Sequence, residues 1–112
     1  MGVKSRRGDS RMIQHMVMFQ FRETLNDETW SMVEQGASKL SKEIPGILGM
    51  QMGRDFSGRG RGFNVGLTVQ FVNREALAAY GPHPAHQSYV EHLRQLGMED
   101  LIVIDFETEG NV

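Results

Sequence analysis

The chain has 112 residues, enough for one domain with a hydrophobic core, and its formal net charge of −2 argues against a protein that coats nucleic acid. It contains no cysteine, which excludes disulfides and thiolate metal sites. No apolar run approaches the roughly 20 residues of a membrane span, and no signal-peptide pattern follows the basic start. We therefore expect a soluble, cytoplasmic protein that binds neither membranes nor nucleic acid.

Residues 1–11 are polar and basic, and they predict a disordered leader. A basic arm for an acidic partner is the alternative. Residues 12–107 are expected to form the domain, and residues 108–112 a tail.

Residues 12–22 alternate with period two, which predicts a strand. Ile13, His15, Val17, Phe19 and Phe21 share one face, and Met12, Gln14, Met16, Met18 and Gln20 share the other. Both faces are fairly apolar, so we expect both to be covered. His15 is the one titratable ring on its face, and it needs a hydrogen-bond partner if it is buried. An isolated histidine of this kind is more often a satisfied core residue than a functional one.

The rest of the chain divides at capping residues, prolines and glycines. We expect a helix from the cap Asn26 to Pro45, strands over 47–55 and 63–72, a short helix after Asn73, another helix from Pro84 to Gly97, and a strand over 101–107. Leu48, Met50 and Met52 are expected on one face of the second strand. The Gly/Arg segment 57–62 predicts a mobile hairpin loop, with anion binding as the alternative.

This βαββαβ order is typical of the ferredoxin-like α+β fold, a four-stranded antiparallel sheet with helices on one face. The second face carries Met12, Met16 and Met18 and is also apolar. Two such sheets packed face to face would form a homodimer, a dimeric α+β barrel.

The stretch from Tyr80 to His86 holds one phenol, two imidazoles and two prolines. Because proline interrupts a helix, we expect a helix to end near Tyr80, a rigid turn, and a new helix at Pro84. Tyrosine and histidine are proton-transfer groups. The alternative is that the prolines only break a helix and the histidines are solvated. His83 and His86 have a metal-ligand spacing but no clear third ligand, so neither a metal nor a cofactor is expected.

Taken in order, these motifs resemble the stress-responsive A/B barrel domain family, called Dabb. The matching pieces are the strand Ile13 to Phe19, Ile44-Pro45-Gly46-Ile47, Gly53, Phe71, Tyr80 with His83-Pro84-Ala85-His86, and Asp105-Phe106. The resemblance covers Met12 to Phe106 and implies a dimeric α+β barrel. It does not imply one function, since many members are known only as stress-associated proteins.

A plant member of the family is a polyketide cyclase that works by intramolecular aldol condensation. The resemblance places its tyrosine and histidine on Tyr80 and His86, and its first-strand histidine on His15, which implies these as catalytic residues. His86 would remove a proton α to a carbonyl, and Tyr80 would polarise that carbonyl. Val65 stands where the cyclase has a further histidine, which implies a more apolar pocket and puts the same substrate in doubt. We expect the substrate to contact Val17, Val65, Leu67, Leu77, His83 and Tyr89.

Three functions stay open. The first is a Dabb protein with a small apolar pocket and no assigned role. The second is a cofactor-independent, cyclase-like enzyme for a small apolar carbonyl compound or a polyketide-like ligand. The third is a quinol-type monooxygenase of the same superfamily, although no residue points to oxygen chemistry.

Overall fold

The computed structural model describes residues 11–108; of the predicted leader and tail, only Arg11 and Thr108 are among the described residues. The elements in chain order are β1 Ile13–Phe21, α2 Asp27–Glu43, β2 Ile47–Arg54, β3 Val65–Phe71, α3 Arg74–Tyr80, α4 Pro84–Gln95 and β4 Met98–Glu107. This confirms the predicted βαββαβ order, with the second helical crossover divided into α3 and α4.

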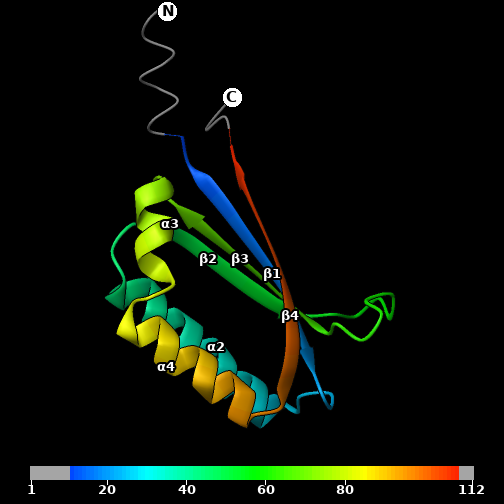
Figure 1. Cartoon of the computed structure of the whole chain (residues 1–112). Helices are drawn as coiled ribbons and strands as arrows, with labels where there is room; N and C mark the ends of the chain where they lie inside the picture. The colour runs from blue at the N-terminus through cyan, green and yellow to red at the C-terminus, as the bar shows by residue number, and fades with distance from the viewer. Residues whose placement is uncertain (1–10, 109–112) are drawn as a thin grey trace, which may run out of the picture.

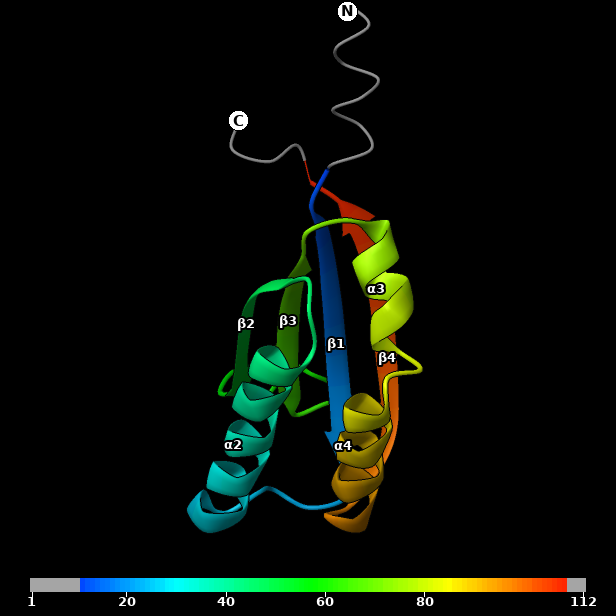
Figure 2. The same cartoon turned by 90° about the vertical axis from the view of Figure 1, so that its left-hand side faces the viewer.

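The four strands form one antiparallel sheet in the order β2-β3-β1-β4, so β1 is central and β4 is an edge strand. The helices all cover one face, with α2 and α4 side by side and α3 beyond the start of α4 (Figures 1 and 2). This is the predicted ferredoxin-like arrangement. The other face of the sheet, which we call the open face, carries no helix of residues 11–108 (Figure 1).

The hydrophobic core lies between the sheet and the helices. Alternate residues of β1 and β3 point into it, as their period-two pattern predicts. On the helical side, α2 contributes the residues that recur at helical spacing. The buried residues of these three elements are Ile13, Val17, Phe19, Phe21, Trp30, Val33, Ala37, Leu40, Val65, Leu67, Val69 and Phe71. His15 shares the core-facing side of β1, and this places it beside the helical layer.

The predicted caps are present. Asn26 Oδ1 accepts a hydrogen bond from the Thr29 amide at 2.8 Å, and Asn73 Oδ1 accepts one from the Ala76 amide at 2.8 Å. Such bonds satisfy amides that the first turn of a helix would otherwise leave free. Gly97 follows α4 with φ of 109°, the left-handed conformation that ends many helices.

The turn between α2 and β2 depends on Gly46. Its φ is 90°, and a Cβ built there would lie 2.5 Å from the Cβ of Ala76 in α3. The Gly46 carbonyl also accepts a hydrogen bond from the Val72 amide at 2.9 Å. The glycine therefore lets this turn pack directly against the start of α3.

Strand β2 differs from the prediction. Its pairing register with β3 shifts between Ile47 and Gly49. Ile47, Met50 and Met52 pack against the core, whereas Leu48 is 53% exposed. The expectation that Leu48 shares a face with Met50 and Met52 was therefore wrong, because the irregularity breaks the period-two alternation.

The other strands differ from their predicted ranges only at their ends, with β3 shorter and β4 longer than expected. In the loop between β2 and β3, the Asp55 carboxylate accepts hydrogen bonds from the Ser57 hydroxyl and the Gly58 amide, and the Ser57 hydroxyl oxygen accepts one from the Arg59 amide. Two of the loop amides, those of Gly58 and Arg59, are therefore already bonded within the loop, and anion binding by the loop stays a prediction.

Candidate acid–base site at the broken crossover

The turn between α3 and α4 sets the positions of the predicted site residues. Tyr80 is the last residue of α3, and His86 lies in the first turn of α4. His83 is the N-cap of α4: its Nδ1 accepts a hydrogen bond from the Ala85 amide at 3.1 Å, and Pro84 begins the helix. The break is therefore a capped turn that holds Tyr80 and His86 a fixed distance apart.

Four rings meet around His15, near the start of β1. The Tyr80 ring packs against both imidazoles, with its centroid 4.3 Å from that of His86 and 5.7 Å from that of His15. Phe71 of β3 packs edge-on against Tyr80 at 4.9 Å and against His15 at 6.0 Å. Strand β1 and the turn between α3 and α4, which are far apart in the sequence, thus bring His15, Tyr80 and His86 into one cluster.

The two tyrosines of the domain use their hydroxyls differently. Tyr89 donates a hydrogen bond to the Val33 carbonyl at 2.7 Å, and its ring packs so closely on α2 that a Cβ at Gly36 would lie 2.5 Å from it. Tyr80 is only 3% exposed, yet its hydroxyl makes no hydrogen bond within residues 11–108. Since no fully buried side-chain polar atom in that range lacks a partner, the Tyr80 oxygen must reach open space.

The environment keeps Tyr80 protonated, because burial raises the pKa of its phenol to about 12. A neutral phenol with no internal partner is available as a hydrogen-bond donor to a ligand. Burial also raises the pKa of Tyr89, but its proton is already committed to Val33.

His86 is held as a neutral base. Its Nδ1 lies 3.0 Å from the Gly81 carbonyl, which accepts, so Nδ1 carries the hydrogen and Nε2 is left to accept a proton. Burial lowers the pKa of His86; the Gly81 bond opposes this shift, and charge on His15 and His83 adds to it. The sequence prediction attributed such a lowering to the start of α4, whereas the structure assigns it chiefly to burial.

His15 has the partner that its burial requires. Its Nδ1 donates to Oδ1 of Asp105 at 2.5 Å, and the two residues are directly paired between β1 and β4. The His15 side chain is 11% exposed and that of Asp105 is 40% exposed. This bond orients the imidazole and commits its Nδ1 hydrogen. The alternation of the last strand predicted that Asp105 shares a face with Leu101 and Val103, but it did not assign Asp105 to the site.

A cavity of about 190 Å³ lies between the sheet, α3 and α4. Of the predicted contact residues, Val17, Leu67, Leu77 and Tyr89 line it together with His15, Tyr80 and His86. The prediction missed the remaining lining residues Phe19, Gly81, Val90, Leu93, Leu101 and Val103.

Two predicted contact residues do not line this cavity. Val65 is a buried core residue at the Arg54 end of β3, and His83 is turned to the helix cap. Residues 11–108 contain no group of three or more His, Cys, Asp or Glu placed to hold a metal ion, so His83 and His86 have no third ligand there.

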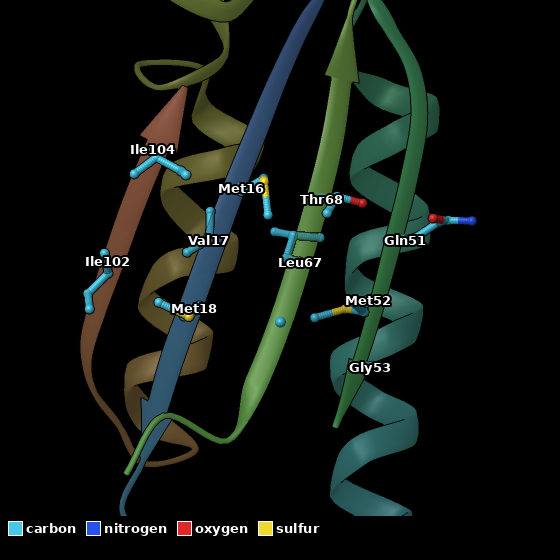
Figure 3. Close-up of a pocket in the computed structure, with 11 residues that line it drawn as sticks. Met16, Val17, Met18, Gln51, Met52, Gly53, Leu67, Thr68, Ile102 and Ile104 are labelled. Atoms are coloured by element: carbon cyan, nitrogen blue, oxygen red, sulfur yellow. The ribbon is translucent and has the colours of Figure 1, made fainter. Parts of the chain in front are cut away.

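The open face of the sheet is a second concave surface (Figure 3). Met16 and Met18 of β1 and Ile102 and Ile104 of β4 stand on it, and a hollow of about 500 Å³ crosses the strands where Gly53 and Gly66 pair. These four large side chains are all more than a third exposed. Within residues 11–108 of one chain, the expectation that both faces of β1 are covered is therefore not met.

The sequence matches the Stress responsive A/B Barrel Domain over residues 13–108. The chain belongs to this family. The family match confirms the Dabb resemblance that the motifs in β1, the α2–β2 turn and the Tyr80–His86 stretch predicted. No curated protein matches the sequence.

Solved structures share the Dabb fold of this chain at low identity. A dimeric ferredoxin-like protein of unknown function from Thermobifida fusca is 19% identical with a TM-score of 0.74, covering 88% of this chain and 92% of its own. A Dabb family protein from Mesorhizobium loti is 23% identical, with a TM-score of 0.71 and coverages of 86% and 95%. The hydroxynitrile lyase of Passiflora edulis is 13% identical, with a TM-score of 0.75 and coverages of 92% and 98%. At these identities the likeness shows the Dabb fold alone.

None of the helices in the described part of this Dabb domain is long and apolar enough to cross a membrane.

Proposed function

We propose that this Dabb protein is a cofactor-independent acid–base enzyme that removes a proton α to the carbonyl of a small ligand. The observation that carries the proposal is the convergence of a free, protonated Tyr80 hydroxyl and a neutral His86 on one apolar cavity. A histidine can take a proton only in its neutral form, and developing oxyanions are stabilised by donors that are already in place.

In this mechanism Nε2 of His86 takes the α proton, and Tyr80 donates a hydrogen bond to the oxygen that becomes an enolate. His15 also packs against the Tyr80 ring and is oriented by Asp105. An enolate formed in this way can attack a second carbonyl or be reprotonated, which is the chemistry that aldol-type cyclases need. The hydroxynitrile lyase among the structural neighbours supports the idea that this fold can carry an enzyme.

Hydrogen exchange tests this function directly. Acetophenone in D₂O should lose its methyl proton signal faster with the protein than in buffer, as followed by ¹H NMR. His86→Ala should lower the catalysed rate by about 10²–10⁴, the usual contribution of a general base. His92→Ala is the matched control, because His92 is an exposed histidine of the same helix. Wild-type exchange no faster than buffer, or exchange that survives His86→Ala, would refute the mechanism.

We propose further that the protein is a homodimer in which the open faces of two sheets pack against each other. Met16, Met18, Ile102, Ile104 and Phe106 are partly exposed on that face, and a large exposed apolar patch usually marks an interface. The Thermobifida fusca protein of the same fold is described as dimeric, which supports this arrangement.

Light scattering after size-exclusion chromatography tests the dimer. Ile104 is 55% exposed, so Ile104→Asp should leave the fold of one chain intact while placing a carboxylate in the interface. We expect a dimer for the wild type and a monomer for Ile104→Asp. Met32→Asp is the control, because Met32 is similarly exposed but lies on α2 in the helical layer. A monomeric wild type would refute the proposal.

A further inference from the structure

The size of the cavity limits what the site can hold. Pockets for drug-sized ligands measure about 300–1,000 Å³, whereas a dry apolar cavity of about 150 Å³ already accepts benzene. The cavity beside Tyr80 and His86 measures about 190 Å³. It therefore has room for one ring, or a hydrocarbon group of similar bulk, together with a small polar substituent.

The charge of its lining limits the ligand further. Among the lining residues there is no lysine, arginine, aspartate or glutamate. The carboxylate of Asp105 bonds to the lining residue His15 and would repel an anion. His86 adds no counter-charge, because burial lowers its pKa. A carboxylate or phosphate inside this cavity would thus be a buried charge without a partner, which is strongly unfavourable.

Polar and apolar groups are separated within the cavity. The donors and acceptors cluster at His15, Tyr80 and His86, whose rings lie in contact. The other lining side chains are apolar, apart from Tyr89, whose hydroxyl is bonded to Val33. They are Val17, Phe19, Leu67, Leu77, Val90, Leu93, Leu101 and Val103. Such a lining suits a molecule with one oxygen function at one end and a hydrocarbon body.

We propose that the substrate of this site is a compact, uncharged ketone or aldehyde with a hydrocarbon group no larger than about one ring. The site rejects ligands that place a carboxylate or phosphate inside the cavity, and it rejects extended polyketide chains. This inference rests on the proposed function, because it names the substrate class of the same site. This substrate class excludes polyketide cyclisation, which was one of the functions that the sequence left open.

Titration of the full ¹⁵N-labelled protein with three probes tests the class. Acetophenone is the matching compound, benzoate replaces the ketone by a carboxylate, and 4-acetylbiphenyl adds a second ring. Acetophenone should bind about tenfold or more tightly than either of the others. Its shifts should map to the amides of Gly81, Val90 and Val103 around the cavity, and Gly53 and Gly66 of the open face should not respond.

Two variants check the location of binding. Val90→Trp should fill the cavity and abolish the Gly81 and Val103 shifts, while the exposed His92→Ala should leave binding unchanged. If Val90→Trp does not fold, the wild-type shift map still decides the site. Equal binding of benzoate or 4-acetylbiphenyl, binding at the open face, or no binding of acetophenone would each overturn the inference. Acetophenone binding without hydrogen exchange would overturn the acid–base function and leave the ligand class intact.

Discussion

The contrast between the two tyrosines can be measured without knowing a substrate. Tyr89→Phe deletes a hydroxyl that donates to the Val33 carbonyl at 2.7 Å, whereas Tyr80→Phe deletes one that has no hydrogen bond within residues 11–108. Both side chains are almost fully buried. Because the two substitutions remove the same atom from similar surroundings, their difference isolates the hydrogen bond.

A buried hydrogen bond of this kind contributes about 1 kcal/mol to the free energy of unfolding. For a domain of this size, about 1 kcal/mol corresponds to a fall in Tm of roughly 4–8 °C. We therefore expect Tyr89→Phe to melt roughly 4–8 °C below the wild type and Tyr80→Phe to melt at the wild-type temperature or slightly above it. The rates of acetophenone hydrogen exchange should show the opposite order, with the lower rate in Tyr80→Phe.

Urea unfolding and thermal melts at one protein concentration provide the assay, because dimerisation makes Tm concentration-dependent. Gly36→Ala is an independent control on the Tyr89 environment, since its Cβ would meet the Tyr89 ring. If Tyr80→Phe destabilises the protein as much as Tyr89→Phe, then the Tyr80 hydroxyl has a structural partner. That result would refute the claim that the Tyr80 hydroxyl is a free hydrogen-bond donor in the cavity.

Three other contacts can be tested by substitution. Because folding lowers the pKa of His86 below its ordinary value of 6.5, the unfolded chain binds more protons than the folded chain once the pH falls below 6.5. The free energy of unfolding should therefore decrease as the pH falls from 6.5. Urea unfolding at several pH values measures this decrease, which should be smaller in His86→Gln. Gly46→Ala should cost about 1–3 kcal/mol in urea unfolding, because φ is positive there and the new Cβ meets Ala76; an unchanged midpoint would contradict the tight turn. Asp105→Asn should lower kcat for the hydrogen exchange of acetophenone more than it changes KM, because the substitution weakens the bond that orients His15. NMR should show a changed tautomer of the His15 imidazole in this variant.

Local features of this chain could be read from its sequence. The caps Asn26 and Asn73 and the helix start at Pro84 lie where their side-chain chemistry predicts them, because each acts on residues within one turn. The alternation in β1 similarly assigned its core face. The placement of Tyr80 and His86 on either side of a rigid turn followed from the prolines and from the family resemblance.

Features that depend on pairing between distant residues could not be read in this way. Asp105 becomes the partner of His15 only through the pairing register of β1 with β4. No local sequence pattern predicts that register. Leu48 faces away from Met50 because of an irregularity in the β2–β3 pairing. The available signal was that Asp105 is the one charged residue in the apolar run from Leu101 to Phe106, on the side that also carries Leu101 and Val103.

The pairing of β4 with β1 also has a consequence for how the protein folds. His15 and Asp105 are 90 residues apart, and β4 is the last element of the domain to be synthesised. Until it arrives, β1 has one unpaired edge, and such an edge can pair with other chains. Closing so long a loop costs chain entropy before the β1–β4 contacts can form and offset it. Non-local pairing of this kind therefore slows folding. A nascent chain that lacks β4 therefore lacks Asp105, the partner of His15, and the cavity wall that Leu101 and Val103 form. Amide exchange during refolding should show β4 protected last.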